Sequence, residues 1–203
     1  MKAVITADII NSSQVESSQW INPLKESLSN FGEQGKYWEI YRGDELQIVL
    51  DEVQNAFAAA VRIKAELKKE SMDARISIGI GEVNFIADNV KESNGTAFIF
   101  SGRNLEEMKK GKSQSLSIRA DNVEFDENFN LIFQLMEPIF EKWTPSAAKS
   151  VLYAVENPNL NQIEIAEKMG ISQGAFSRAL KRANFESIQE TDSYFRKKST
   201  LFQ

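Results

Sequence analysis

The stretch 37–50, YWEIYRGDELQIVL, constrains the fold more than any other part of the chain. Two runs of β-forming residues, 37–41 and 46–50, flank a short polar break with the sequence RGDE. Strand-forming runs separated by a short break that contains glycine are typical of a β-hairpin. The sequence therefore predicts a hairpin with an acidic tip.

Two carboxylates are expected to meet at this end of the sheet. Asp44 lies in the hairpin break, and Asp8 directly follows another short apolar strand, residues 3–7. Two neighbouring carboxylates can hold a divalent metal, Mg²⁺ or Mn²⁺, against a phosphate. The structural alternative is that Gly-Asp merely suits an exposed hairpin turn and that Asp8 only solvates a strand end.

Composition limits the chemistry that is available to the chain. At 203 residues and 42% hydrophobic content, it has room for one medium domain and one small one. It contains no cysteine and no histidine, which excludes disulfides, thiolate nucleophiles, the usual zinc sites and imidazole-based triads. No apolar run approaches the length of a membrane span, and the chain starts directly into a strand, so we expect a cytoplasmic protein without membrane contact.

Hydrophobic periodicity predicts alternating strands and helices through the first two thirds of the chain. Besides the strands named above, we expect helices at 20–31, 51–70 and 96–110 and strands at 74–83 and 115–120. This order matches the βαββαβ ferredoxin-like arrangement, in which the first strand lies inside the sheet beside the hairpin. One face of strand 74–83 carries Ser77, Gly79 and Gly81, and such small residues indicate the close approach of a helix or a ligand.

The last third of the chain has a different pattern. Residues 121–130 are expected to be an acidic connector, and 131–143 an apolar helix that docks on the first domain or joins two protomers. Thr144-Pro145 is a typical helix entry and begins a new unit. We therefore expect an α+β domain at 1–125, a connecting helix at 126–143 and a small all-α domain at 144–203, with a loosely ordered end.

Residues 161–183, NQIEIAEKMGISQGAFSRALKRA, predict two short helices joined at a glycine. The first runs from about Gln162 to Met169, Gly170 supplies the left-handed turn, and Ser172 caps the second. The residues that fall where two crossing helices have to touch are Ile165, Ala166, Ile171, Phe176 and Leu180.

This spacing is similar to that of a helix-turn-helix, whose second helix enters the major groove of double-stranded DNA. The residues expected to face bases are Ser172, Gln173 and Ser177, and those expected to reach bases or phosphates are Arg178, Lys181 and Arg182. The alternative is a helical pair that only packs, but three basic residues without a nearby acid favour DNA. Because the basic count is modest, we expect a homodimer that presents two recognition helices.

Four segments together resemble the SatD family. They are ADIINSS at 7–13, YRGDELQ at 41–47, RISIGIGEV at 75–83 and SNGTAFIFSGRNLEEM at 93–108. The resemblance covers nearly the whole chain, and the helix-turn-helix is similar to that of many members. More distantly, the first domain resembles class III and GGDEF nucleotide cyclases, which implies Asp8 and Asp44 as metal ligands and Arg103 as a nucleotide-binding residue.

The chain departs from the cyclases at three positions. Ile99 stands four residues before Arg103, where cyclases have a catalytic asparagine, and Ile40 stands where adenylyl cyclases have a purine-selecting lysine. Arg42 replaces the first glycine of the GGDEF signature. A cyclase has to position and polarise its substrate, so these departures imply a degenerate cyclase-like site and argue against turnover as a cyclase.

Three hypotheses follow. The leading one is a DNA-binding transcriptional regulator whose degenerate cyclase-like domain binds a ligand such as a nucleotide, or dimerises. The second is a metal-dependent enzyme that acts on a nucleoside triphosphate through Asp8 and Asp44. The third is a protein that only assembles with other proteins, and fold similarity alone does not choose among the three.

Overall fold

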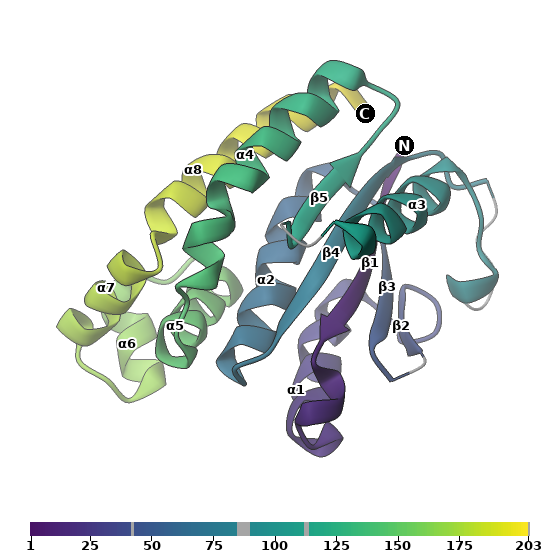
Figure 1. Cartoon of the computed structure of the whole chain (residues 1–203). Helices are drawn as coiled ribbons and strands as arrows, with labels where there is room; N and C mark the ends of the chain where they lie inside the picture. The colour runs from purple at the N-terminus through teal and green to yellow at the C-terminus, as the bar shows by residue number, and fades with distance from the viewer. Residues whose placement is uncertain (42, 85–89, 112–113, 203) are drawn as a thin grey trace.

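A computed structural model describes residues 1–41, 43–84, 90–111 and 114–202 (Figure 1). In this part of the chain a five-stranded sheet is covered by helices on both faces, and the C-terminal third is helical. The expected α+β class is confirmed. Arg42, in the polar break of the predicted hairpin, lies outside the described residues.

The sheet has the strand order β2-β3-β1-β4-β5. Its strands are β1 (Lys2–Ile10), β2 (Trp38–Tyr41), β3 (Glu45–Leu50), β4 (Asp73–Gly81) and β5 (Leu116–Arg119). Neighbouring strands are antiparallel, except that β4 and β5 are parallel. The predicted hairpin is therefore present as β2 and β3, and β1 lies between β3 and β4, as expected.

The two faces of the sheet differ in chemistry because side chains alternate along each strand. One face is aliphatic, with Ile5, Ile48 and Ile78 fully buried, and it packs against α1 (Ser17–Leu28) and α2 (Ala56–Lys69). The opposite face is covered by α3 (Thr96–Lys110). In Figure 1, α3 lies in front of the sheet, and α1 and α2 lie behind it.

Small residues let α3 approach β4 closely. A Cβ atom on Gly79 would overlap the carbonyl oxygen of Ala97 and the amide nitrogen of Ser101, and one on Gly81 would overlap Thr96. The expectation of a close approach along this strand is therefore confirmed, and the neighbour is a helix.

Hydrogen bonds join α3 to this face of the sheet. The hydroxyls of Thr6 and Ser101 lie 2.9 Å apart, and the amide of Asn104 donates to Ser77 at 2.9 Å. Asn104 also accepts from the Ser117 hydroxyl at 3.2 Å. These side chains are buried, so their polar atoms satisfy one another where water is excluded.

Helix α4 (Val123–Glu141) includes most of the segment that we expected to be an acidic connector. The Asn122 side chain caps it by accepting a hydrogen bond from Phe125 N at 2.9 Å. Its buried residues recur at steps of three and four and are Phe125, Phe129, Phe133, Met136 and Phe140. The connector prediction was wrong because this aromatic stripe needs a helix that starts eight residues earlier than expected.

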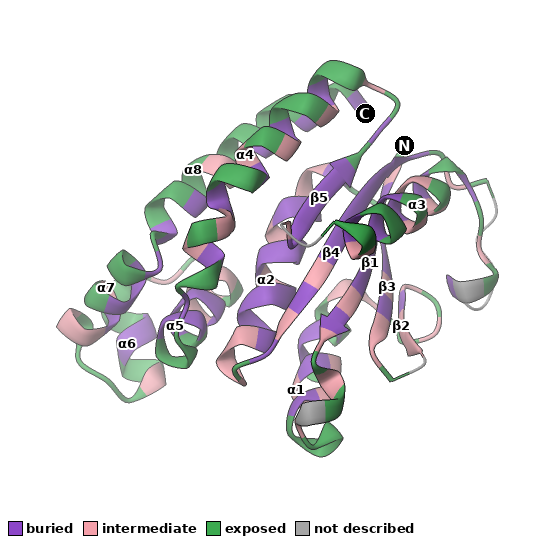
Figure 2. Cartoon of the chain, viewed as in Figure 1, coloured by how far each residue is buried: buried purple, intermediate pink, exposed green. Residues whose placement is uncertain are grey.

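The C-terminal third consists of α5 (Pro145–Glu156), α6 (Gln162–Met169), α7 (Gln173–Arg182) and α8 (Phe185–Ser199). The prediction of a loosely ordered end was wrong, because α8 runs back beside α4 (Figure 1) and buries Phe185, Ile188 and Phe195. Exposed residues lie on the outer sides of α4 and α8, and buried ones face the sheet and α2 (Figure 2).

Candidate nucleic-acid interface and acidic cluster

Helix α6 and the turn after it are fixed by local hydrogen bonds. The Asn161 side chain accepts from Ile163 N at 2.9 Å and Glu164 N at 3.2 Å, and Asn161 N donates to the Glu164 carboxylate at 2.7 Å. This reciprocal capping satisfies amides at the start of the helix. Gly170 ends α6 with a φ of 68°, a conformation that favours glycine.

Ser172 caps α7 as predicted, and its hydroxyl accepts from Ala175 N at 3.2 Å. Four of the five residues expected at the helix crossing are buried, namely Ile165, Ala166, Phe176 and Leu180. The fifth, Ile171, is 39% exposed. It lies in the turn, where its amide bonds to Ala166 O while its side chain is left at the surface.

Two further contacts hold α7 in place. The indole of Trp143 donates to the carbonyl of Ala183, directly after α7, at 3.1 Å. Helix α5 packs against α7, and Thr144 caps α5 by accepting from Ala147 N at 3.3 Å. The outer face of α7 is therefore presented by a supported helix rather than by a mobile segment.

The structure places the predicted DNA-contacting residues along one helix. Arg178, Lys181 and Arg182 are exposed and form no ion pair within the described part of the chain. Ser172 and Gln173 are also exposed, and Ser177 is half-buried. The Gln173 amide donates to the side chain of Gln162 on α6 at 3.2 Å, which orients the start of α7.

A groove of about 500 Å³ lies between α5 and α7. Four cationic residues line it, namely Lys69, Lys149, Arg178 and Arg182, and its described lining contains no acidic residue. Lys69 is partly neutralised by Glu66 at 2.6 Å. Lys149 is exposed and unpaired among the described residues.

Sequence reasoning missed Lys69 and Lys149 as candidates. Lys149 lies on the supporting helix, and its position four residues after Pro145 was the available signal, because that turn packs beside the second helix of such a unit. Lys69 comes from α2, which is far away in sequence, and its placement depends on how α5 docks on α2.

The second candidate site lies at the end of β1. Asp8 is opposite Glu45 on β3 and opposite Arg75 on β4. Its carboxylate accepts a hydrogen bond from the Arg75 guanidinium at 3.1 Å and lies 3.9 Å from the Lys109 ammonium. The structure therefore brings two cationic side chains to this carboxylate.

Lys109, near the end of α3, bridges the acidic residues. Its ammonium donates to Glu45 at 3.0 Å and to Glu106 at 3.1 Å. Partial burial alone lowers the pKa of Lys109, but the hydrogen bonds to Glu45 and Glu106 and the charge of Asp8 outweigh it and raise the pKa. The lysine is therefore held as a cation between the carboxylates.

The two predicted metal ligands, Asp8 and Asp44, are not paired across the sheet. The cross-strand neighbour of Asp8 on β3 is Glu45. Asp44 is half-buried, and its backbone carbonyl accepts from Ile9 N at 2.8 Å. No group of three or more His, Cys, Asp or Glu side chains is placed to hold a metal among the described residues, and a divalent ion between Asp8 and Glu45 would have to displace Lys109.

Arg103, the predicted nucleotide-binding residue, is exposed on α3 and forms no ion pair with a described residue. It precedes Lys109 by six residues, so the two side chains point about 120° apart around the helix. It forms no ion pair with the acidic cluster, which consists of Asp8, Glu45, Arg75, Glu106 and Lys109.

Comparison with known families establishes the family of the chain. A model of the SatD family matches residues 2–201, from β1 to the end of the C-terminal helices. The chain belongs to the SatD family. The match spans both the sheet that carries the acidic cluster and the helices that line the basic groove. No match was found among curated proteins or solved structures, and no described helix is long and apolar enough to cross a membrane.

Proposed function

We propose that this SatD protein is a DNA-binding transcriptional regulator of the cytoplasm, in which α5, α6 and α7 act as a helix-turn-helix. The observation that carries the proposal is the basic groove between α5 and α7, which is lined by Lys69, Lys149, Arg178 and Arg182. Lys69 is paired with Glu66, but Lys149, Arg178 and Arg182 form no ion pair with a described residue and are free to attract a phosphate backbone.

The position of α7 supports the same conclusion. Helices α6 and α7 lie at the end of the molecule opposite the β2–β3 hairpin, so the sheet leaves the outer face of α7 open (Figure 1). Gln173 and Ser177 at the start of α7 are suited to reading base edges, while Lys149 and Arg182 are suited to phosphates on either side.

We propose that the regulator acts as a homodimer. A single groove supplies only a few phosphate contacts, so two copies are needed for firm binding. Helix α4 carries three exposed apolar residues, Val123 at 73%, Leu131 at 57% and Leu135 at 70% exposed. They lie on the outer side of the helix and offer a self-complementary surface.

The first domain is proposed to be a degenerate cyclase-like fold. The β2-β3-β1-β4 part of the sheet order agrees with the ferredoxin-like βαββαβ arrangement. The enzyme alternative has less support, because Lys109 and Arg75 already neutralise Asp8 where a catalytic metal would bind. Ligand sensing or dimerisation by this domain, with or without Mg²⁺ or Mn²⁺, requires no turnover.

The proposal is tested by the salt dependence of binding to a labelled duplex, measured by fluorescence anisotropy. Lys149→Ala and Arg182→Ala are each expected to weaken binding and to reduce the slope of log K against log salt by about 1. Lys197→Ala is the matched control, since it removes the same charge from the exposed far half of α8. Equal effects at all three positions would contradict the proposed interface.

A further inference from the structure

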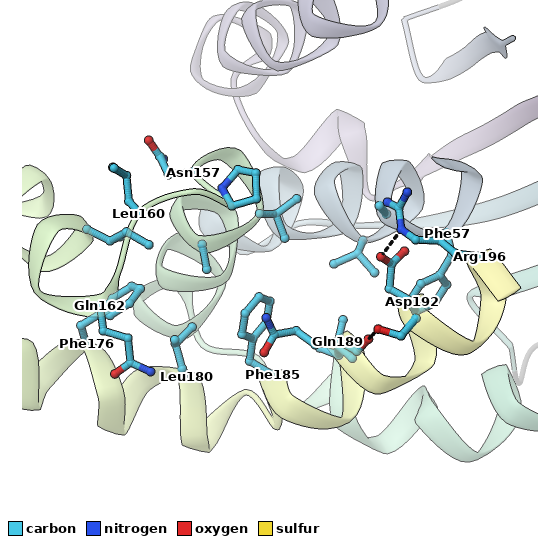
Figure 3. Close-up of a pocket in the computed structure, with 18 residues that line it drawn as sticks. Phe57, Asn157, Leu160, Gln162, Phe176, Leu180, Phe185, Gln189, Asp192 and Arg196 are labelled. Carbon is cyan, nitrogen blue, oxygen red and sulfur yellow. Dashed lines mark hydrogen bonds and ion pairs between the residues drawn. The ribbon is translucent and has the colours of Figure 1, made fainter. Parts of the chain in front are cut away.

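A second cavity lies between the sheet domain and the C-terminal helices (Figure 3). Its volume is about 410 Å³, within the range of small-molecule sites. Its apolar wall combines α2 with α6, α7 and α8 and includes Phe57, Val61, Ile165, Phe176, Leu180 and Phe185. This cavity is open to solvent on one side, and its lining shares no residue with the acidic cluster or the basic groove.

At one end of this cavity, a carboxylate has one oxygen atom without a hydrogen-bond donor. The Asp192 carboxylate accepts from Arg196 Nε at 2.6 Å through Oδ2, and Arg196 also donates to Asn55 at 2.8 Å. The other oxygen, Asp192 Oδ1, is buried and has no hydrogen-bond partner among the described residues. A buried acceptor without a donor is costly, and Asp192 is one of the residues that line the cavity.

We propose that this cavity binds a small amphipathic amine, with an aromatic or aliphatic body and an ammonium group that donates to Asp192 Oδ1. The apolar wall would contact the aromatic or aliphatic body of the ligand, and the free carboxylate oxygen would accept a hydrogen bond from its ammonium group. Arg196 donates through Nε to Asp192 and through Nη1 to Asn55, so its charge is already paired with a carboxylate and a carboxylate ligand meets the charge of Asp192. Figure 3 shows Asp192 and Arg196 toward one end of the cavity and Phe176 and Leu180 toward the other.

Binding at this cavity would connect the two halves of the molecule. Phe57 and Val61 belong to α2, which packs on the sheet, whereas Phe176 and Leu180 belong to α7. A ligand that contacts both sets stabilises the packing of the C-terminal helices on α2 by mass action. The binding claim itself does not depend on whether α7 recognises DNA.

Three indole compounds of similar size provide the test, because the cavity has room for about a dozen water-sized groups. They are tryptamine, tryptophol and indole-3-acetate, which carry an ammonium, a hydroxyl and a carboxylate. Titration calorimetry and thermal unfolding of the full chain are expected to show one tryptamine site and a raised unfolding midpoint. Tryptamine should bind about ten-fold more tightly than indole-3-acetate, with tryptophol in between.

Two variants locate the site. In Asp192→Asn, an amide N–H faces the cavity when the amide oxygen faces Arg196. The affinity for tryptamine should therefore fall about ten-fold and no longer exceed that for tryptophol. Ala58→Leu narrows the cavity and should lower the affinity for all three compounds. Glu190→Gln, at an exposed position of α8, should leave all three affinities unchanged. The proposal is overturned if tryptamine does not bind the folded chain, or if it binds both cavity variants as it binds the unaltered chain.

Discussion

At the scale of single residues, glycines on β4 set the distance between α3 and the sheet. The sequence showed small residues on one strand face but did not show whether a helix or a ligand approached them. The structure answers this question, because Ala97 and Ser101 occupy the space that a side chain on Gly79 would need. The identity of the neighbour was not predictable, since it depends on the docking of a helix far along the chain.

Gly79→Ala is expected to destabilise the fold by about 2–4 kcal/mol, because the new methyl group meets rigid backbone atoms. Gly102→Ala is the matched control, because it lies inside α3, where an added Cβ would have nothing within 4 Å. That substitution should stabilise by about 0.5–1 kcal/mol. Denaturant unfolding measures both values, and similar stabilities for the two variants would contradict the close packing.

The acidic cluster was predictable only in part. The strand ends indicated carboxylates at one edge of the sheet, and Asp8 and Glu45 do lie there. Their cation, Lys109, follows Asp8 by about a hundred positions, and no local pattern links the two. Of the predicted metal pair Asp8 and Asp44, Asp8 lies beside Lys109 in the structure, and the second carboxylate next to that lysine is Glu45.

Lys109→Met is expected to strengthen Mn²⁺ binding by about ten-fold, because it removes a positive charge that lies beside Asp8 and Glu45. Titration calorimetry with Mn²⁺ measures the effect. Lys110→Met, which changes the neighbouring exposed lysine, should leave the affinity unchanged. A folded Lys109→Met protein with the affinity of the parent would show that Lys109 does not occupy a cation site.

At the scale of elements, α4 and α8 differ most from the sequence prediction. Acidic residues suggested a connector at 121–130, yet Glu124 and Asp126 lie in the first turn of α4, where the exposed carboxylate of Glu124 suits the helix dipole. The signal that we underused was phenylalanine at every fourth position from Phe125 to Phe133. The basic C-terminal segment contains a similar stripe of apolar residues on α8. The burial of this stripe depends on packing against α4, which the local sequence does not reveal.

Asp126 is expected to make stability depend on pH. Burial raises its pKa from 3.8 to about 6, although a hydrogen bond from Ala120 N opposes this change. Between these values the folded state binds more protons than the unfolded state, so its stability falls as the pH rises from about 4 to 6.

Asp126→Asn keeps an acceptor for Ala120 N and loses the buried charge. The variant should be more stable than the parent at pH 7 by about 1 kcal/mol, since partial exposure screens the full effect, and equally stable below pH 4. Urea unfolding at several pH values measures the difference, with Asp121→Asn as an exposed control. A difference that does not change with pH would contradict this assignment.

At the scale of the whole molecule, one aromatic core connects the sheet domain with the C-terminal helices. Phe57 of α2 stacks on Phe133 of α4 at a centroid distance of 5.6 Å and contacts Phe195 of α8 at 6.1 Å. The division at 125 and 143 remains a prediction, but these contacts cross both boundaries. The sequence could not reveal the core because its members are far apart along the chain.

Phe195→Ala is expected to lower the free energy of unfolding by about 3–5 kcal/mol, because the ring is fully buried in this core. The loss should affect the sheet and the C-terminal helices together, so circular dichroism and tryptophan fluorescence should give one coincident transition. The neighbouring Tyr194→Ala, at an exposed position, should cost much less. Separate transitions of the two halves would contradict a shared core.

The central claim is that the basic groove and α7 bind specific DNA, and selection of bound fragments from random duplex DNA tests it most directly. The parent chain, Arg178→Ala/Lys181→Ala and the charge-matched control Lys197→Ala/Lys198→Ala are compared at low salt. We expect the parent and the control to enrich the same two-fold related motif, and the α7 variant to enrich none. Failure of the parent to enrich any motif, or recovery of the same motif by the α7 variant, would contradict the claim.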